Sequence, residues 1–143
     1  MRIELPAERT LVYETTMPIR WGDMDAMGHV NNTVYFRYME SARIEWFERL
    51  GCPVDPQGEG PVIGNAFCNF LRQLEYPGVL RVRTYVGAVG NSSFDTYHEI
   101  LLDDDAEARV RANGGATVVW VNFPEQRAVP LPERIRQALR RSF

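Results

Sequence analysis

One stretch, residues 19–50, constrains the fold of this chain more than any other. Its first part reads Ile-Arg-Trp-Gly-Asp-Met-Asp-Ala-Met-Gly-His-Val-Asn-Asn, and this polar, glycine-containing sequence is typical of a strand end that runs into a loop. Its second part predicts one long helix that ends near Leu50. A short amide side chain at Asn31 or Asn32 can cap the first turn, and Gly51 can end the last one.

The predicted helix carries apolar side chains around most of its circumference. Val34, Tyr35, Tyr38, Met39, Ala42, Trp46 and Leu50 follow three- and four-residue spacing, and Phe36, Ile44 and Phe47 widen that stripe. A helix that is apolar nearly all round is normally buried, and at about 1.5 Å per residue this one can cross a small domain. We therefore expect a central helix that other structural elements wrap round, with a carboxylate-bearing loop at its N-terminal end.

Most of the remaining sequence predicts strands. Alternating apolar residues and intervening turn signals place strands at residues 11–21, 62–75, 79–89, 93–102 and 116–123. Another strand begins in 106–112, where Gly114-Gly115 predicts a bulge or a hairpin break. Proline-rich loops are expected at 52–61 and 124–132, and a short, exposed, arginine-rich helix is expected at 132–141.

One helix cannot cover a sheet of this size and leave only polar residues outside. The simplest α+β arrangement is a curved antiparallel sheet of about five strands wrapped round the central helix, with a sheet edge or open face that pairs with a second copy. The length of 143 residues predicts a single domain over 1–143.

Composition excludes several functional classes. The net charge of −3 does not indicate a nucleic-acid surface, and the apolar runs are too short to span a membrane. The N-terminus lacks the apolar core of a signal peptide, so we expect a cytoplasmic protein with no membrane partner. Cys52 and Cys68 have neither metal-ligand spacing nor a paired histidine, so a metal site and a thiol nucleophile are not expected.

Several motifs together resemble one enzyme family. The segment from Arg20 to Asn32 is similar to the signature of hotdog-fold acyl-CoA thioesterases related to 4-hydroxybenzoyl-CoA thioesterase. The helix motif from Tyr35 to Trp46, the segment Gly90-Asn91-Ser92-Ser93-Phe94 and the closing segment from Val118 to Pro132 resemble the same family. The resemblance implies a homodimer, or a dimer of dimers, with active sites between subunits. It also implies hydrolysis of an acyl thioester of coenzyme A or of acyl-carrier protein, without metal or cofactor.

Asp25 is the catalytic residue that the resemblance implies, because it is the second aspartate of the Gly-Asp-x-Asp stretch. A carboxylate can attack a thioester carbonyl directly or draw a proton from water, and the sequence leaves both roles open. The developing oxyanion needs hydrogen-bond donors, and the N-terminus of the predicted helix offers free N–H groups. Asp23 alternates with Asp25 and is expected to hydrogen-bond within the loop.

Neighbouring residues are candidates for positioning the substrate. The resemblance implies that the backbone N–H near Asn32 is the oxyanion donor, while the side chains of Asn31 and Asn32 are expected as caps. Gly28 allows a sharp turn close to the substrate. His29 either positions the loop or substrate carbonyl or is a hydrogen-bonded structural residue.

Other charged and polar residues remain open at this stage. Glu40 competes as a catalytic acid, but arginines three residues to either side predict a paired, structural carboxylate. Arg81 and Arg83 share one strand face and are candidates for the phosphates of coenzyme A. Ser92 and Ser93 lie in a turn and are candidates for contacts with the pantetheine arm or with the partner's aspartate loop.

Two further functions remain as alternatives. A non-catalytic hotdog module would bind acyl-CoA without releasing thiol. A hotdog enoyl-CoA hydratase or dehydratase would need both Asp25 and His29. The acyl group itself cannot be read from one chain, because the partner subunit would line part of the pocket.

Overall fold

The computed structural model describes residues 1–52 and 55–141, so residues 53–54 of the predicted loop 52–61 lie outside the described chain. Its helices are α1 (Asn32–Arg49) and α2 (Glu133–Ala138), with a single 3₁₀ turn at Trp21–Asp23. Its strands are β1 (Thr10–Ile19), β2 (Glu59–Phe70), β3 (Gly78–Val89), β4 (Ser93–Leu102), β5 (Val110–Asn122) and β6 (Arg127–Ala128).

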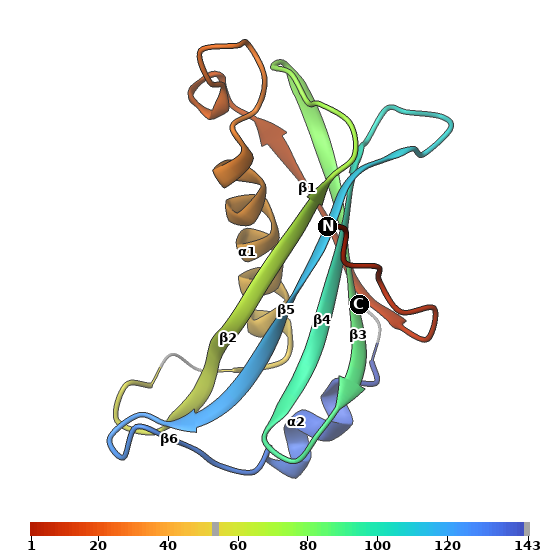
Figure 1. Ribbon diagram of the computed structural model, residues 1–143. Helices are drawn as coiled ribbons and strands as arrows, with labels where there is room; N and C mark the ends of the chain where they lie inside the picture. The colour runs from red at the N-terminus through yellow and green to blue at the C-terminus, as the bar shows by residue number, and fades with distance from the viewer. Residues whose placement is uncertain (53–54, 142–143) are drawn as a thin grey trace.

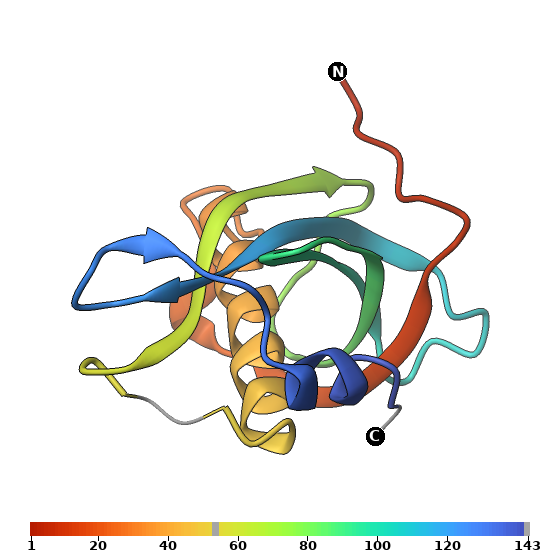
Figure 2. The ribbon, with the colours of Figure 1, turned by 90° about the horizontal axis from the view of Figure 1, so that it is seen from below.

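The strands form one antiparallel sheet in the order β1-β3-β4-β5-β2, and the short β6 pairs with the end of β5. The sheet curves round one side of α1, and α2 lies at its lower end (Figures 1 and 2). This arrangement confirms the predicted hotdog architecture. Of the helices in the described ranges, neither combines the length and the apolar character needed to cross a bilayer.

Helix α1 begins and ends where its capping residues predict. The Asn31 side chain accepts hydrogen bonds from the Thr33 backbone N–H at 2.9 Å and from the Thr33 hydroxyl at 2.7 Å. At the other end Gly51 has a φ of +74° and donates its N–H to the Glu48 carbonyl at 3.0 Å. A left-handed residue after the last turn favours glycine, so the sequence stops the helix there.

The buried face of α1 joins two groups of core side chains. Near its N-terminal end Tyr35, Tyr38 and Met39 pack with residues of β3 and β4. Near its C-terminal end the fully buried Trp46 packs with Phe94 of β4 at a ring separation of 6.0 Å, in a cluster that also includes α2 side chains.

One side of α1 is partly open in the single chain. Phe36 is 37% exposed and Ile44 is 51% exposed, because the sheet curves round only one side of the helix. Helix α2 is more buried than predicted. It is not simply an exposed helix, because Ile135 is fully buried and Leu139, directly after the helix, is 2% exposed.

Strand β5 runs without a break through Gly114 and Gly115, so the predicted interruption is wrong. A Cβ at Gly114 would collide with the carbonyl oxygen of Phe67 on β2. A Cβ at Gly115 would lie 2.6 Å from the carbonyl oxygen of Thr96 on β4. The two glycines therefore permit close strand packing and do not end the strand.

Other strand boundaries differ from the predicted ones by a few residues. Strand β1 ends at Ile19, and Trp21 lies in the 3₁₀ turn with its side chain 78% exposed. A bulge between Leu11 and Tyr13 shifts the alternation, which buries Val12 and leaves Leu11 37% exposed. Strand β2 spans Glu59–Phe70 instead of the predicted 62–75, in line with its pairing to β5.

Candidate active site

The loop between β1 and α1 is a tight structure held by its own backbone. Asp25 donates its N–H to the His29 carbonyl at 2.8 Å, and Gly28 donates to the Asp25 carbonyl at 3.1 Å. Gly28 has a φ of +80°, which confirms the sharp turn predicted there. The loop is anchored to the β2–β3 connection, because Val30 donates to the Leu74 carbonyl at 2.8 Å.

The Asp25 carboxylate is held at one oxygen. Its Oδ1 accepts hydrogen bonds from the backbone N–H groups of Met27 at 2.9 Å and of His29 at 3.3 Å. Across residues 1–52 and 55–141, Oδ2 accepts none. The side chain is half-buried, so one oxygen fixes the orientation and the other remains able to react.

Asn32, the first residue of α1, lines the same groove as Asp25. Asn31 caps the Thr33 N–H, and Val34 donates to the Asn31 carbonyl at 3.0 Å. The N–H of Asn32 has no protein partner within the described ranges. A free N–H at the positive end of a helix dipole is a suitable donor for a developing oxyanion.

A groove of about 440 Å³ brings these groups together. Its lining includes Asp25, Met27, His29, Asn32, Tyr35 and Phe70. Tyr35 and Phe70 form one apolar wall, with their rings edge to face at 5.1 Å. The groove therefore combines a carboxylate, a free backbone donor and an aromatic surface, which suits a polar reacting group attached to an apolar chain.

Asp23 has a different role from Asp25. Its Oδ2 accepts a hydrogen bond from the Tyr38 hydroxyl at 2.7 Å and another from the Arg20 backbone N–H at 2.8 Å. Burial raises the pKa of Tyr38, and the nearby Asp23 raises it further, so the phenol stays protonated and can donate. The prediction that Asp23 hydrogen-bonds within the loop region is confirmed.

His29 lies in the groove but does not pair with Asp25 through its ring. Its Nε2 lies 3.6 Å from Glu75 Oε1, whereas its backbone groups make the contacts to Asp25. This arrangement fits a residue that holds the loop. Glu40 is paired with Arg37 at 2.8 Å, as predicted, and it is absent from the lining of the Asp25 groove.

The four residues predicted for coenzyme A lie elsewhere. Arg81 contacts Asp103 at 2.7 Å, and Arg83 contacts Glu14 at 2.8 Å, so both guanidinium groups already have carboxylate partners. Ser92 lies in the β3–β4 turn and Ser93 is the first residue of β4, and this turn is at the opposite end of the molecule from the β1–α1 loop (Figure 1). A contact between that turn and an Asp25 loop would therefore need a second subunit.

The two thiols lie outside this chemistry. Burial raises the pKa of Cys68 to about 12, and it also raises the pKa of Cys52. Both are therefore protonated near neutral pH and are poor nucleophiles.

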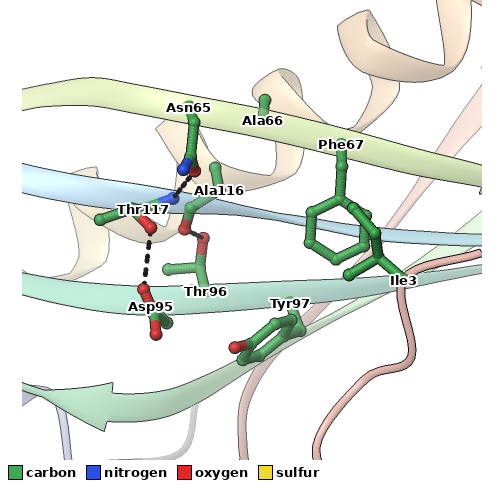
Figure 3. Close-up of a pocket in the computed structure, with 9 residues that line it drawn as sticks. All are labelled: Ile3, Asn65, Ala66, Phe67, Asp95, Thr96, Tyr97, Ala116 and Thr117. Carbon is green, nitrogen blue, oxygen red and sulfur yellow. Dashed lines mark hydrogen bonds between the residues drawn. The ribbon is translucent and has the colours of Figure 1, made fainter.

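A second hollow, of about 410 Å³, lies on the sheet face that points away from α1 (Figure 3). Its polar groups pair with one another: Thr117 donates its hydroxyl proton to Asp95 at 2.9 Å and its N–H to Asn65 at 3.2 Å. Its lining comes from strands and from Ile3, so it lacks a helix N-terminus that could stabilise an oxyanion.

Sequence reasoning found the Asp25 loop but missed the aromatic wall of its groove. Tyr35 lies one turn inside α1, so its position near the helix end gave a usable signal. Phe70 comes from the end of β2, and only the three-dimensional pairing of β2 with β5 brings it beside Tyr35.

Comparisons with known proteins identify the family to which this fold belongs. A family model described as the thioesterase-like superfamily matches residues 19–139. The solved structure of the PA2801 protein, a candidate thioesterase of Pseudomonas aeruginosa, is 38% identical; the match covers 91% of this chain and 99% of that one, with a TM-score of 0.85. A gentisyl-coenzyme A thioesterase structure is 27% identical over 89% of this chain and 99% of its own, with a TM-score of 0.78.

A curated relative in a plant extends the same similarity. The chloroplastic acyl-acyl carrier protein thioesterase ATL3 of Arabidopsis thaliana is 28% identical over 127 residues, which cover 87% of this chain and 65% of that protein. The family match and the relatives lead to one conclusion: this chain belongs to the thioesterase-like superfamily, and it is a hydrolase of acyl thioesters.

Proposed function

We propose that this protein is an acyl-CoA thioesterase in which Asp25 carries the reaction and the Asn32 N–H stabilises the oxyanion. One observation carries the proposal. The unbonded Oδ2 of Asp25 and the unpartnered N–H of Asn32 belong to residues that line the same groove. A thioester carbonyl bound there would find a base or nucleophile and an oxyanion donor together.

In the general-base route, Asp25 Oδ2 takes a proton from water as the water oxygen attacks the carbonyl carbon. The carbonyl oxygen becomes an oxyanion and accepts a hydrogen bond from Asn32 N–H. The oxyanion then reforms the carbonyl, the carbon–sulfur bond breaks, and the thiolate takes the proton held by Asp25. The products are the free acid and the thiol.

In the nucleophile route, Asp25 Oδ2 attacks the carbonyl carbon itself and displaces the thiolate. The resulting mixed anhydride is then hydrolysed by water, which restores the carboxylate. Single-turnover reactions in oxygen-18 water separate the two routes. Label in the Asp25 carboxyl group would require the anhydride, whereas an acid product with one labelled oxygen per molecule and unlabelled Asp25 is expected for a general base.

Coenzyme A is the proposed carrier of the acyl group. The gentisyl-coenzyme A thioesterase structure supports this choice, because it matches most of the length of both chains. Arg81 and Arg83 remain the proposed phosphate contacts, with exchange of their present carboxylate partners for the phosphates of coenzyme A. Acyl-carrier protein is the competing carrier, because the Arabidopsis relative is named for it.

A homodimer is the proposed working unit. Within residues 1–52 and 55–141, strand β2 pairs with β5 along one edge and with no strand along the other. Val62 is 37% exposed, Phe70 on the same strand is 47% exposed, and Ile44 on the adjoining helix face is 51% exposed. A free edge beside apolar side chains favours pairing with β2 of a second copy, which would also cover the open side of α1.

The proposal is tested by following thiol release from a panel of short-chain, long-chain and aryl acyl-CoA thioesters and from matched acyl-carrier-protein thioesters. We expect release of free coenzyme A from at least one class, with a higher kcat/KM than for the carrier-protein thioester of the same acyl group. Tight acyl-CoA binding without thiol release would instead support a binding module. A loss of enoyl-CoA absorbance with no change in the concentration of free thiol would support a hydratase.

A further inference from the structure

Another groove lies between the C-terminal half of α1 and the beginning of β2, and it is called the α1–β2 groove below. Its volume is about 380 Å³, and it is distinct from both the Asp25 groove and the hollow in Figure 3. Its apolar lining includes Ile44, Phe47, Cys52, Pro61, Ile63 and Phe123. Nothing in the reaction described above uses this groove.

The groove contains an unpartnered buried cation. Arg43 is only 6% exposed and lines the groove. No ion pair or hydrogen bond joins it to any residue in 1–52 or 55–141. Arginine remains protonated in proteins, and a buried charge without a partner is costly. The site therefore has a strong reason to bind an oxygen acceptor.

The protein supplies no counter-charge from the buried side of Arg43. The nearest titratable group there is His98 on β4, which is fully buried and accepts or donates a hydrogen bond at Nδ1 with the Thr84 hydroxyl at 3.1 Å. Burial, and to a smaller extent the positive charge of Arg43, lowers the pKa of His98 to about 3. The imidazole is therefore neutral at ordinary pH and does not offset the charge of Arg43.

Three carboxylates also line the groove, and the charge of one of them, Glu40, raises the pKa of Arg43 against the larger lowering by burial. Glu40 is already paired with Arg37 at 2.8 Å. Glu48 and Asp55 are exposed, so water and salt screen their repulsion of an incoming anion. Arg43 is buried and lines this largely apolar groove, and a charge-assisted hydrogen bond from a guanidinium to a carboxylate is about twice as strong as a neutral one.

The flank of α1 that bears Arg43 leads back to the Asp25 groove. Asn32, Phe36, Arg43 and Phe47 fall on one face of the helix, because they are separated by four, seven and four positions. Asn32 lines the Asp25 groove, and Arg43 and Phe47 line the α1–β2 groove. At about 1.5 Å per residue, the helix places Arg43 about 16 Å from Asn32, a span that an extended acyl group can cover.

We propose that the α1–β2 groove holds the distal end of the acyl group and that Arg43 recognises a carboxylate there, so that the preferred substrates are thioesters of dicarboxylic acids. This inference rests on the proposed thioesterase function and adds a substrate class to it. The apolar lining would contact the methylene or aryl part of the chain. The guanidinium would donate two parallel hydrogen bonds to the terminal carboxylate.

The test compares matched coenzyme A thioesters that differ only in the presence of a terminal carboxylate, over a series of chain lengths. We expect the wild-type protein to favour the carboxylate form at the chain length that reaches Arg43. Arg43→Met should lower that preference, measured as a ratio of kcat/KM values, by roughly 10- to 100-fold. The preference ratio of Arg43→Lys should lie between those of the wild-type protein and Arg43→Met, because an ammonium is charged but lacks the planar pair of donors. Arg49→Met, an exposed position on the same helix, is the matched control and should leave the ratio unchanged.

Binding of the free dicarboxylic acid separates this inference from the proposed function. If no thioester is hydrolysed, the proposed function fails, and the acid should still raise the melting temperature of the wild-type protein but not of Arg43→Met. An unchanged preference ratio in Arg43→Met would overturn the inference. A wild-type preference for the uncharged chain at every length would overturn it even if the variants do not fold. Dissociation of a dimer in Arg43→Met with no change in ligand response would also overturn it, and would place Arg43 in a subunit contact.

Discussion

Tyr38 donates its hydroxyl proton to Asp23 Oδ2 at 2.7 Å, and this contact ties the second turn of α1 to the loop that carries Asp25. Asp23 also accepts the Arg20 N–H at 2.8 Å, and its carbonyl accepts the Asn31 N–H at 2.9 Å. One aspartate therefore fixes the loop onto the helix. The other, two residues later, keeps an oxygen without a protein partner in the described chain.

Replacement of Tyr38 by phenylalanine should weaken this anchor. The change removes the hydroxyl that Asp23 accepts and leaves a partly buried carboxylate with one donor fewer. We expect the free energy of unfolding, measured in urea, to fall by about 1–3 kcal/mol. The loss of thioesterase activity should be smaller than the loss caused by a change at Asp25. Unchanged stability in Tyr38→Phe would show that the contact does not hold the loop.

The Asn32 N–H can be removed with little damage to the helix. Asn32→Pro deletes this donor at the first helical position, where proline is well tolerated. The preceding Asn31 is already extended, with φ −61° and ψ 140°, as a residue before proline requires. We expect kcat to fall by about 10²–10³ while the melting temperature changes little.

Asn32→Ala is the control for that variant, because it keeps the N–H and removes only the side chain. It should retain most of the activity. Equal losses in the proline and alanine variants would assign the effect to the side chain and contradict the backbone oxyanion donor.

His98 should make the protein sensitive to acid. Its pKa is lowered to about 3 in the folded state by burial and by Arg43, against about 6.5 in an unfolded chain. Between these values the unfolded chain binds the proton and the folded protein does not, so the free energy of unfolding falls as pH drops. The decrease should approach about 1.4 kcal/mol per pH unit within this window.

His98→Gln removes the titrating ring and keeps a group that can hydrogen-bond with Thr84. Whatever its stability at pH 7, the variant should lose less stability than the wild type on acidification from pH 6.5 towards pH 4. Urea titrations at several pH values measure the two slopes. Parallel curves would contradict the assignment of a buried neutral histidine.

Pairing through the β2 edge predicts a change of oligomeric state. Val62→Lys places a charge on the free edge strand, where it should oppose strand addition. We expect a shift from dimer to monomer in light scattering, together with a loss of activity if active sites need both subunits. Val79→Lys changes a valine that is 46% exposed on the interior strand β3, and it should leave the mass unchanged. A dimer that persists in Val62→Lys would contradict the β2 interface.

The local signals in the sequence predicted much of this fold. Asn31 and Gly51 place both ends of α1, because capping depends on residues next to each other in the chain. Strands β3 and β4 follow their alternation closely. The loop around Asp25 was also recognisable, because its glycine, aspartates and asparagines are short-range turn and cap residues.

The errors arise where distant segments meet. Gly114 and Gly115 suggest a break when read locally, but they are required by the approach of β2 and β4 from either side. Apolar residues all round α1 predict burial, but no sequence pattern says whether the cover comes from the same chain or from another copy. The pairing of Tyr35 with Phe70 and the burial of Arg43 likewise depend on tertiary packing.

The most direct test of the whole account is the rate of thiol release by Asp25→Asn on the best acyl-CoA substrate of the wild-type protein. Asparagine keeps an oxygen that can accept the Met27 and His29 N–H groups, so the loop should remain folded. Asp23→Asn is the matched control in the same loop and should keep most of the activity. We predict that Asp25→Asn lowers kcat by about 10²–10⁴ at an unchanged melting temperature. A folded Asp25→Asn protein within tenfold of the wild-type rate would contradict the account.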